Sequence, residues 1–96
     1  MSAAKSTRKV TIVNPQGIHA RPANMIVKCA IQFTSEIVIV KGNERINGKS
    51  ILEILTLAAT EGTELNLEAE GPDAEEALAA LADLIAQGFG EMETMN

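Results

Sequence analysis

Between Thr63 and Glu70, polar and apolar residues alternate, and this pattern restricts the fold more than any other feature of the chain. Leu65, Leu67 and Ala69 share one side of an extended segment, and acidic residues and Asn66 share the other side. A period of two is typical of a strand whose sheet has one face on the core and one face in water. Other elements of the chain must therefore cover the buried face of this sheet.

Two further segments have strand character. In Lys9–Val13 the apolar residues Val10 and Ile12 share one face, and Glu36–Lys41 is rich in β-branched residues. Gly42 and Asn43 follow directly, and this pair is typical of a tight hairpin turn. The sequence therefore predicts a hairpin whose second strand is short and covers residues 44–46.

The segment Ala20–Ile31 has apolar residues at the spacing of one helical face. Pro22 lies in its first turn, where the missing amide hydrogen costs no hydrogen bond. The chain before it contains the loop-forming residues Pro15 and Gly17. We therefore expect a helix over Ala20–Ile31 with His19 as its N-cap.

Two more helices are expected later in the chain. Ser50 and Glu53 have the spacing of a capping box, and Gly62 is the expected end of the helix that they open. Asp73 with Glu76 repeats the pattern, and an apolar stripe then continues to about Gly88.

The length of 96 residues is that of one domain, so we predict a single domain over 1–96. Its core is expected at about 8–87, with loose ends at 1–7 and 89–96. The element order β-α-β-β-α-β-α indicates an α+β open-faced sandwich. A ferredoxin-like fold shares the first six elements, so the order of elements alone does not decide the topology.

Composition excludes several classes of protein. Residues 1–49 contain 8 basic and 2 acidic residues, and residues 50–96 contain 11 acidic and no basic residues. This charge separation predicts an electrically polar molecule. The net charge of −5 and the presence of only Phe33 and Phe89 as aromatic residues argue against nucleic-acid binding.

We expect a cytoplasmic protein that does not insert into membranes, because no apolar run is long enough to span one and the first residues lack a secretory signal. The single cysteine, Cys29, cannot form an internal disulfide and is expected to pack within the first helix. One thiol and one histidine are too few for a structural zinc site, so no metal is predicted.

His19 lies where a loop meets the start of the first predicted helix. The amides of Ala20 and Arg21 have no partner within the helix there, and the helix dipole adds partial positive charge, so this end can bind an anion. A neutral imidazole is a nitrogen nucleophile. The combination predicts a phosphoryl group on His19 whose oxygens the Arg21 guanidinium contacts, with Lys28 and Lys49 extending the positive field.

The sequence contains no nucleotide-binding loop, no acidic metal cluster and no serine or cysteine nucleophile at a recognisable spacing from a base. A phosphoryl group on His19 would therefore arrive from one protein and leave to another, without a cofactor and without turnover of its own. The residues alone leave two other interpretations open. In the first, His19 serves only as a helix cap and Arg21 is a solvated charge. In the second, His19 is the base of a small enzyme whose catalytic partner group the sequence does not show.

The segment 14–23, Asn-Pro-Gln-Gly-Ile-His-Ala-Arg-Pro-Ala, resembles the active-site signature of HPr, the histidine-containing phosphocarrier of the bacterial phosphotransferase system. The usual form is G-L-H-A-R-P-A, and only Ile18 differs from it. A second family block is present at residues 47–57, and Glu61-Gly62-Thr63 leads into the alternating strand. The resemblance covers about residues 8–87.

This resemblance implies a four-stranded antiparallel sheet in the order 1-4-2-3 with three helices on one face. It implies that His19 accepts a phosphoryl group on Nδ1 from enzyme I, charged by phosphoenolpyruvate, and passes it to a histidine of an EIIA-type protein, assisted by Arg21. We expect transient partners and a monomer. The partner-binding positions carried over from the family are Ala20, Lys28, Lys49, Ile51, Leu52 and Leu55.

The second helix supports part of this expectation, because residues 51–57 contain more apolar side chains than one buried face of a short helix needs. A wider buried face is the alternative. Some of these side chains are therefore expected to stay exposed as a contact patch.

Ser50 matches the position at which an HPr kinase phosphorylates some family members. Glu53 replaces the glycine found in the Gram-positive pattern, and its negative charge one turn away opposes a phosphate on Ser50. The acidic C-terminal half fits nitrogen-regulatory relatives as well as sugar-transport carriers. A regulatory module that uses the same docking face without carrying phosphate is the alternative function.

Overall fold

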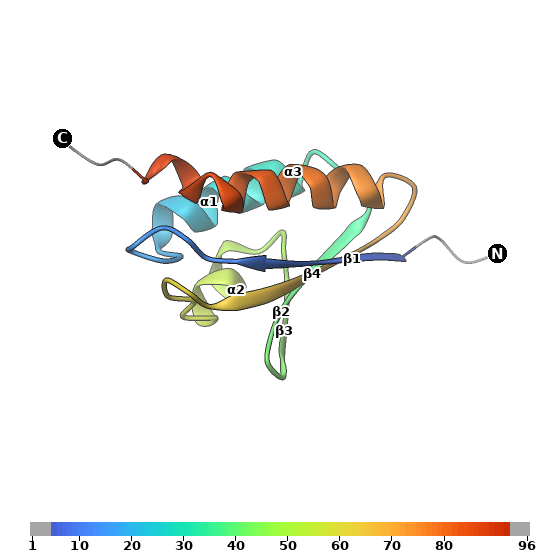
Figure 1. Ribbon diagram of the computed structural model, residues 1–96. Coiled ribbons are helices and arrows are strands. Elements are labelled where there is room, and N and C mark those ends of the chain that lie inside the picture. Colours follow the sequence, from blue (N-terminus) through green and yellow to red (C-terminus); the bar gives the residue numbers. More distant parts are fainter. Residues whose placement is uncertain (1–4, 93–96) are drawn as a thin grey trace.

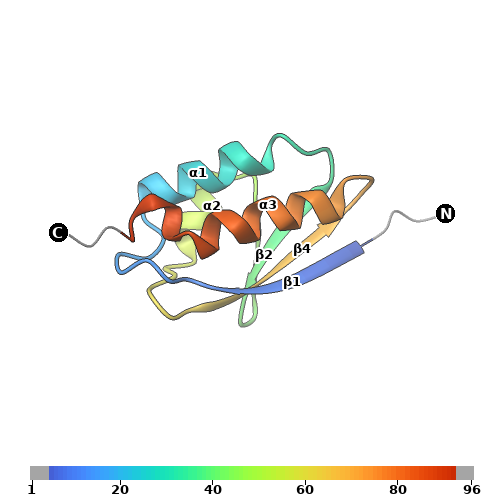
Figure 2. The same ribbon diagram turned by 45° about the horizontal axis from the view of Figure 1, so that its top comes forward.

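The structure is a computed structural model that describes residues 5–92. Its antiparallel sheet has the strand order β1-β4-β2-β3. Figures 1 and 2 show α1 and α3 beside each other across one face of the sheet. The predicted HPr-like order is confirmed, and the elements are β1 (Lys5–Thr11), α1 (Ala20–Ala30), β2 (Glu36–Lys41), β3 (Glu44–Asn47), α2 (Ile51–Thr56), β4 (Glu64–Glu70), α3 (Ala74–Ala86) and the 3-10 turn η1 (Gly88–Gly90).

The alternating strand is β4, and it lies between β1 and β2. Leu65, Leu67 and Ala69 are at most 1% exposed, whereas the residues between them face solvent wholly or in part. Helices α1, α2 and α3 each add side chains to the core beneath them. The largest fully buried apolar side chains are Ile12, Ile26, Ile39, Ile54, Leu57, Leu65, Leu67, Leu81, Ile85 and Phe89.

Strand β1 begins earlier than predicted. The expectation of a loose end over residues 1–7 is wrong for Lys5, Ser6 and Thr7, which pair with Glu70, Ala69 and Glu68 of β4. Their local sequence has no strand periodicity, so the pairing with β4 places them in the sheet. Residues 1–4, and 93–96 at the other end, lie outside the described residues.

Helix α2 ends well before Gly62, contrary to the prediction. Ala58 has a positive φ of 51°, which breaks the helix, and the Lys41 ammonium donates to the Leu57 carbonyl at 2.7 Å. At the other end the Ser50 hydroxyl accepts the Glu53 amide at 3.2 Å, as a capping box requires. The Glu53 carboxylate accepts a hydrogen bond from the amide of Asn47 and not from that of Ser50. Of the two hydrogen bonds of the predicted capping box, only the one to the Ser50 hydroxyl therefore forms.

Asp73 stands before α3, but its side chain makes no capping hydrogen bond. Its carboxylate accepts the backbone amides of Thr34 and Ser35, both at 2.9 Å, and the Ser35 hydroxyl. The predicted helix cap is therefore a tertiary link between the α1–β2 loop and the start of α3.

The predicted loose tail over 89–96 is wrong for its first residues. Phe89 is 0% exposed and lies in the core, although its φ of 57° is unusual for a bulky side chain. Burial of the ring outweighs the backbone strain and holds η1 against the domain. The described chain therefore reaches Glu91 in a defined position.

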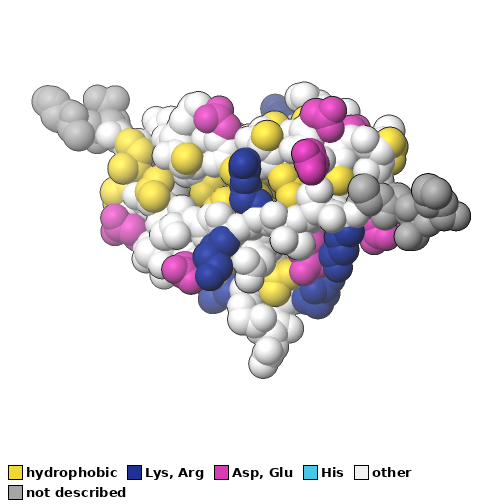
Figure 3. Space-filling model, turned by 45° about the vertical axis from the view of Figure 1, so that its right-hand side comes forward, with side chains coloured by type: hydrophobic (Ala, Val, Ile, Leu, Met, Phe, Trp, Pro, Cys, Tyr) yellow, Lys and Arg dark blue, Asp and Glu magenta, His cyan; other side chains and the backbone are white. Residues whose placement is uncertain are grey.

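Within the sheet, acidic and basic residues from the two halves of the sequence lie side by side. Acidic residues of β4 pair with basic residues from the first half of the chain, as in Lys5–Glu68 at 3.5 Å and Arg45–Glu68 at 2.8 Å. On the face drawn in Figure 3, basic and acidic side chains are interspersed. The polarity of the molecule as a whole stays a prediction. None of the helices in residues 5–92 combines the length and apolar character that a membrane span requires.

Candidate functional site

The loop between β1 and α1 places His19 at the start of α1. The Ile18 amide donates to the Ala59 carbonyl at 2.8 Å, and Ile18 itself is buried. His19 is the N-cap, as predicted, with an extended backbone, and its carbonyl accepts the Ala23 amide at 3.0 Å. Its side chain makes no capping hydrogen bond, so the imidazole is available to other groups.

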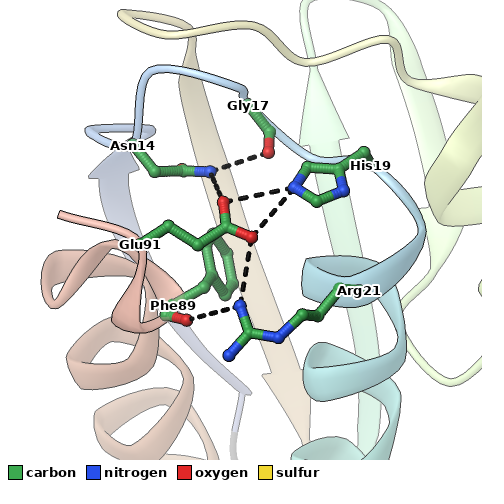
Figure 4. A network of polar contacts seen from close by, with 6 residues as sticks. All are labelled: Asn14, Gly17, His19, Arg21, Phe89 and Glu91. Atoms are coloured by element: carbon green, nitrogen blue, oxygen red, sulfur yellow. Dashed lines mark hydrogen bonds and ion pairs between the residues drawn. The ribbon is translucent and has the colours of Figure 1, made fainter. Parts of the chain in front are cut away.

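The imidazole contacts a carboxylate from the far end of the chain (Figure 4). His19 Nε2 lies 2.9 Å from Oε2 and 3.2 Å from Oε1 of Glu91. Asn14 Nδ2 donates to the same Oε1 at 2.9 Å and to the Gly17 carbonyl at 2.8 Å. The carboxylate therefore joins the β1–α1 loop to the segment that follows η1.

Arg21 completes this network from the first turn of α1. Its Nη1 lies 3.1 Å from Glu91 Oε2 and 3.3 Å from the carbonyl oxygen of Phe89. The predicted pair His19 and Arg21 thus share one carboxylate, and both side chains stay accessible, at 39% and 59% exposed. The Glu91 side chain is only 16% exposed.

The contacts define the proton position on His19. Partial burial raises the pKa of Glu91, but hydrogen bonds from His19, Asn14 and Arg21 outweigh it, and the pKa lies below its usual value. An ionised carboxylate only accepts hydrogen bonds, so Nε2 carries the hydrogen that is donated to Glu91. In a neutral ring Nδ1 then holds a lone pair, and Figure 4 shows this atom on the side of the ring away from Glu91.

Sequence reasoning missed Asn14 and Glu91 as members of the site. Asn14 is 0% exposed, so the first residue of the segment 14–23 is a buried polar residue. The sequence predicts Glu91 in the loose tail 89–96. The signal that could have placed it is Phe89 between two glycines, because a large apolar side chain after a polar helix end needs a core to cover it.

The two lysines predicted to extend the positive field lie away from His19. Lys49 donates to the Phe33 carbonyl at 2.8 Å, beyond the C-terminal end of α1, while His19 is at the N-terminal end. An eleven-residue helix spans roughly 16 Å. Lys28 lies in the last turn of α1. The structure brings Arg21 to the histidine, but it does not bring Lys49 there.

Helix α2 carries the predicted apolar patch. Ile51, Leu52 and Leu55 are 37%, 78% and 36% exposed, whereas Ile54 and Leu57 are buried. The alternative of a wider buried face is therefore wrong. Their use in partner binding remains a prediction, as does modification of Ser50, whose hydroxyl caps α2.

The Cys29 thiol and the possible metal ligands are the other reactive side chains of interest. Partial burial raises the pKa of the Cys29 thiol, which packs against the core. Within residues 5–92, no three histidine, cysteine or acidic side chains are grouped as metal ligands.

Known proteins resemble this chain over most of its length. The family model "PTS HPr component phosphorylation site" matches residues 6–87. Phosphocarrier protein HPr of Neisseria meningitidis is 45% identical over 90% of this chain and 97% of that protein. The corresponding protein of Treponema pallidum is 43% identical over 88% of this chain and 96% of its own length.

Solved structures show the same fold. A crystal structure of HPr from Thermoanaerobacter tengcongensis has a TM-score of 0.86 and 44% sequence identity, and the match covers 90% of this chain and 97% of that chain. HPr from Bacillus anthracis has a TM-score of 0.82 and 39% identity, covering 85% of this chain and 98% of that chain. The chain therefore belongs to the HPr family, the phosphocarrier proteins of the phosphotransferase system.

Proposed function

We propose that His19 is the residue that carries the phosphoryl group, and that Nδ1 is the accepting atom. The donor is enzyme I, charged by phosphoenolpyruvate, and the acceptor is a histidine of an EIIA-type protein. Arg21 contacts the phosphoryl oxygens, and the amides of Ala20 and Arg21 at the start of α1 add partial positive charge. The protein itself performs no independent turnover.

The contact between His19 Nε2 and Glu91 is the observation that carries this proposal. His19 Nε2 lies 2.9 Å from the carboxylate, so a hydrogen on Nε2 can be donated to it and the lone pair of the neutral ring is then on Nδ1. The partial exposure of the ring allows a partner to reach that atom. A histidine that served only as a helix cap would use its side chain to accept an amide of α1, and His19 does not.

We propose that partners dock on the surface formed by Ala20 and the exposed side of α2. Leu52 is the most exposed large apolar residue in the described chain, at 78%. An apolar patch next to a basic residue, Lys49, suits an acidic partner that binds briefly, because charge raises the association rate and a small apolar contact permits fast release. We include Lys28, in the last turn of α1, and Lys49, directly before α2, as the basic residues that partners contact.

The test is phosphorylation by enzyme I and phosphoenolpyruvate, followed by intact mass and phosphorus NMR before and after mild acid. The wild-type protein is expected to gain one acid-labile phosphoryl group, and His19→Ala none. Arg21→Ala is expected to slow the transfer, and Arg8→Ala, which removes an exposed arginine of β1, is its matched control.

The result decides between the two functions considered. If His19→Ala still acquires an acid-labile phosphate, the assignment of His19 is wrong. If the wild-type protein acquires none under conditions that charge another HPr, the regulatory docking module becomes the better description.

A further inference from the structure

Glu91 reaches the site because the core holds the residue two positions before it. Phe89 is fully buried, and Gly88 and Gly90 on either side have positive φ values of 67° and 75°. Arg21 Nη1 also donates to the Phe89 carbonyl at 3.3 Å. The position of the carboxylate is therefore determined by a buried ring and a defined turn.

Both oxygens of this carboxylate are held in place. Oε1 accepts from Asn14 at 2.9 Å, and Asn14 is itself buried and bonded to the Gly17 carbonyl. Oε2 lies 3.1 Å from Arg21. The His19 ring therefore donates to a carboxylate that cannot easily rotate away, and its orientation is held with it.

We infer that Glu91 is a positioning residue for phosphoryl transfer at His19, an inference that rests on the proposed function. The carboxylate keeps the hydrogen on Nε2 and so keeps the lone pair on Nδ1. It also lies beside the positive charge that the ring gains when Nδ1 becomes bonded to phosphorus. A carboxylate that orients an imidazole in this way acts through the histidine and does not touch the reacting phosphorus.

The step balances without another reactant. The Nδ1 lone pair forms the nitrogen–phosphorus bond while the bond from phosphorus to the donor breaks, and that electron pair stays with the donor. Nε2 keeps its hydrogen, and the ring becomes a cation opposite the Glu91 carboxylate. When the phosphoryl group leaves to the acceptor, the electron pair returns to Nδ1 and the ring is neutral again.

The first variant is Glu91→Gln, which keeps the shape and removes the charge. Its amide has one oxygen, so its nitrogen must face either Asn14 or Arg21, and both of these are donors. Glu91→Ala removes both acceptors, and Glu91→Asp keeps the charge on a shorter side chain. Glu76→Gln removes an exposed carboxylate from the opposite end of α3 and controls for net charge.

Two measurements test the inference on proteins whose melting temperatures show that they are folded. Nitrogen-15 NMR of the neutral His19 ring is expected to show the Nε2–H tautomer in the wild type and a measurable Nδ1–H fraction in Glu91→Gln and Glu91→Ala. The kcat/KM with which enzyme I phosphorylates the protein is expected to fall about 10-fold in these two variants and to recover in part in Glu91→Asp. Glu76→Gln is expected to match the wild type in both.

An unchanged tautomer and an unchanged rate in Glu91→Ala would overturn the inference. Faster phosphorylation in Glu91→Ala would also overturn it, because the carboxylate would then be an obstacle to phosphate. Failure of the proposed function can be distinguished from failure of this inference. The wild-type protein would then accept no phosphoryl group, whereas the tautomer of His19 is measured without any partner.

Discussion

The backbone of Gly17 lies against the carbonyl of Ala59, where a Cβ on the glycine would come within 2.5 Å of the oxygen. The next amide, that of Ile18, donates to the same oxygen at 2.8 Å. This contact joins the loop before His19 to the segment after α2. The histidine is therefore positioned by packing between two distant parts of the chain as well as by the start of α1.

Substitution of Gly17 by alanine is expected to destabilise the protein and to displace His19. The glycine has a φ of 69°, and the added methyl group would also lie 2.9 Å from the Cα of Thr60. Backbone strain of this kind costs about 1–3 kcal/mol, and the contact with Ala59 adds to it. Urea denaturation of Gly17→Ala measures the loss, and the phosphorylation rate is expected to fall with it.

Gly42→Ala is the matched control, because that glycine has a φ of 59° with no neighbouring atom within 4 Å of an added Cβ. It should lose only the cost of the backbone conformation, about 1 kcal/mol, and keep the wild-type phosphorylation rate. Equal destabilisation by both substitutions would show that the contact with Ala59 contributes nothing.

The link from Asp73 to the α1–β2 loop is expected to make stability depend on pH in the acid range. Hydrogen bonds from the Ser35 hydroxyl and the Thr34 amide lower the pKa of Asp73 from 3.8 to about 2. The folded state thus binds the proton more weakly than the unfolded state, so the stabilisation is complete above about pH 4 and is lost as the pH falls towards 2.

Asp73→Asn should therefore be less stable than the wild type near neutral pH, with the difference shrinking between about pH 4 and pH 2. Urea titrations across this range measure it. Asp83→Asn, which changes an exposed carboxylate of α3, is expected to have little effect. A constant difference between Asp73→Asn and the wild type at all pH values would contradict this account.

Phe89→Ala is expected to cost about 3–5 kcal/mol, because the ring is fully buried and a large-to-small change leaves a cavity. Denaturation by urea measures the loss. Phe33→Ala removes a ring that is only partly buried and should cost less. If the Phe89 variant were as stable as the wild type, the ring would not hold the C-terminal segment, and Glu91 would need another anchor.

Leu52→Ala should separate partner binding from stability. Leu52 is 78% exposed, so its truncation is expected to change the free energy of unfolding by less than about 0.5 kcal/mol while lowering kcat/KM with enzyme I. Ile54, two positions later on the same short helix, is 0% exposed, and Ile54→Ala is expected to cost about 2–5 kcal/mol. A normal phosphorylation rate in Leu52→Ala would exclude α2 from the docking surface for enzyme I.

Local sequence determined most of the elements. The alternation in β4, the helical spacing of α1 and the Gly42-Asn43 turn each depend on neighbours a few residues apart, and the structure has them where they were predicted. The position of His19 at the start of α1 follows from the same local signals. Topology came from the family resemblance, because the order of elements is shared with another fold.

Only the tertiary structure decided what surrounds the histidine. Glu91 meets His19 because Phe89 is buried. The Gly-Phe-Gly segment indicates the burial of the ring, but nothing in the local sequence indicates that His19 lies beside Glu91. Asp73 likewise accepts hydrogen bonds from Ser35 and Thr34 instead of capping α3. The physical reason is common to both: a polar side chain bonds to whichever partners the packing of the core brings near, and those partners are far away along the chain.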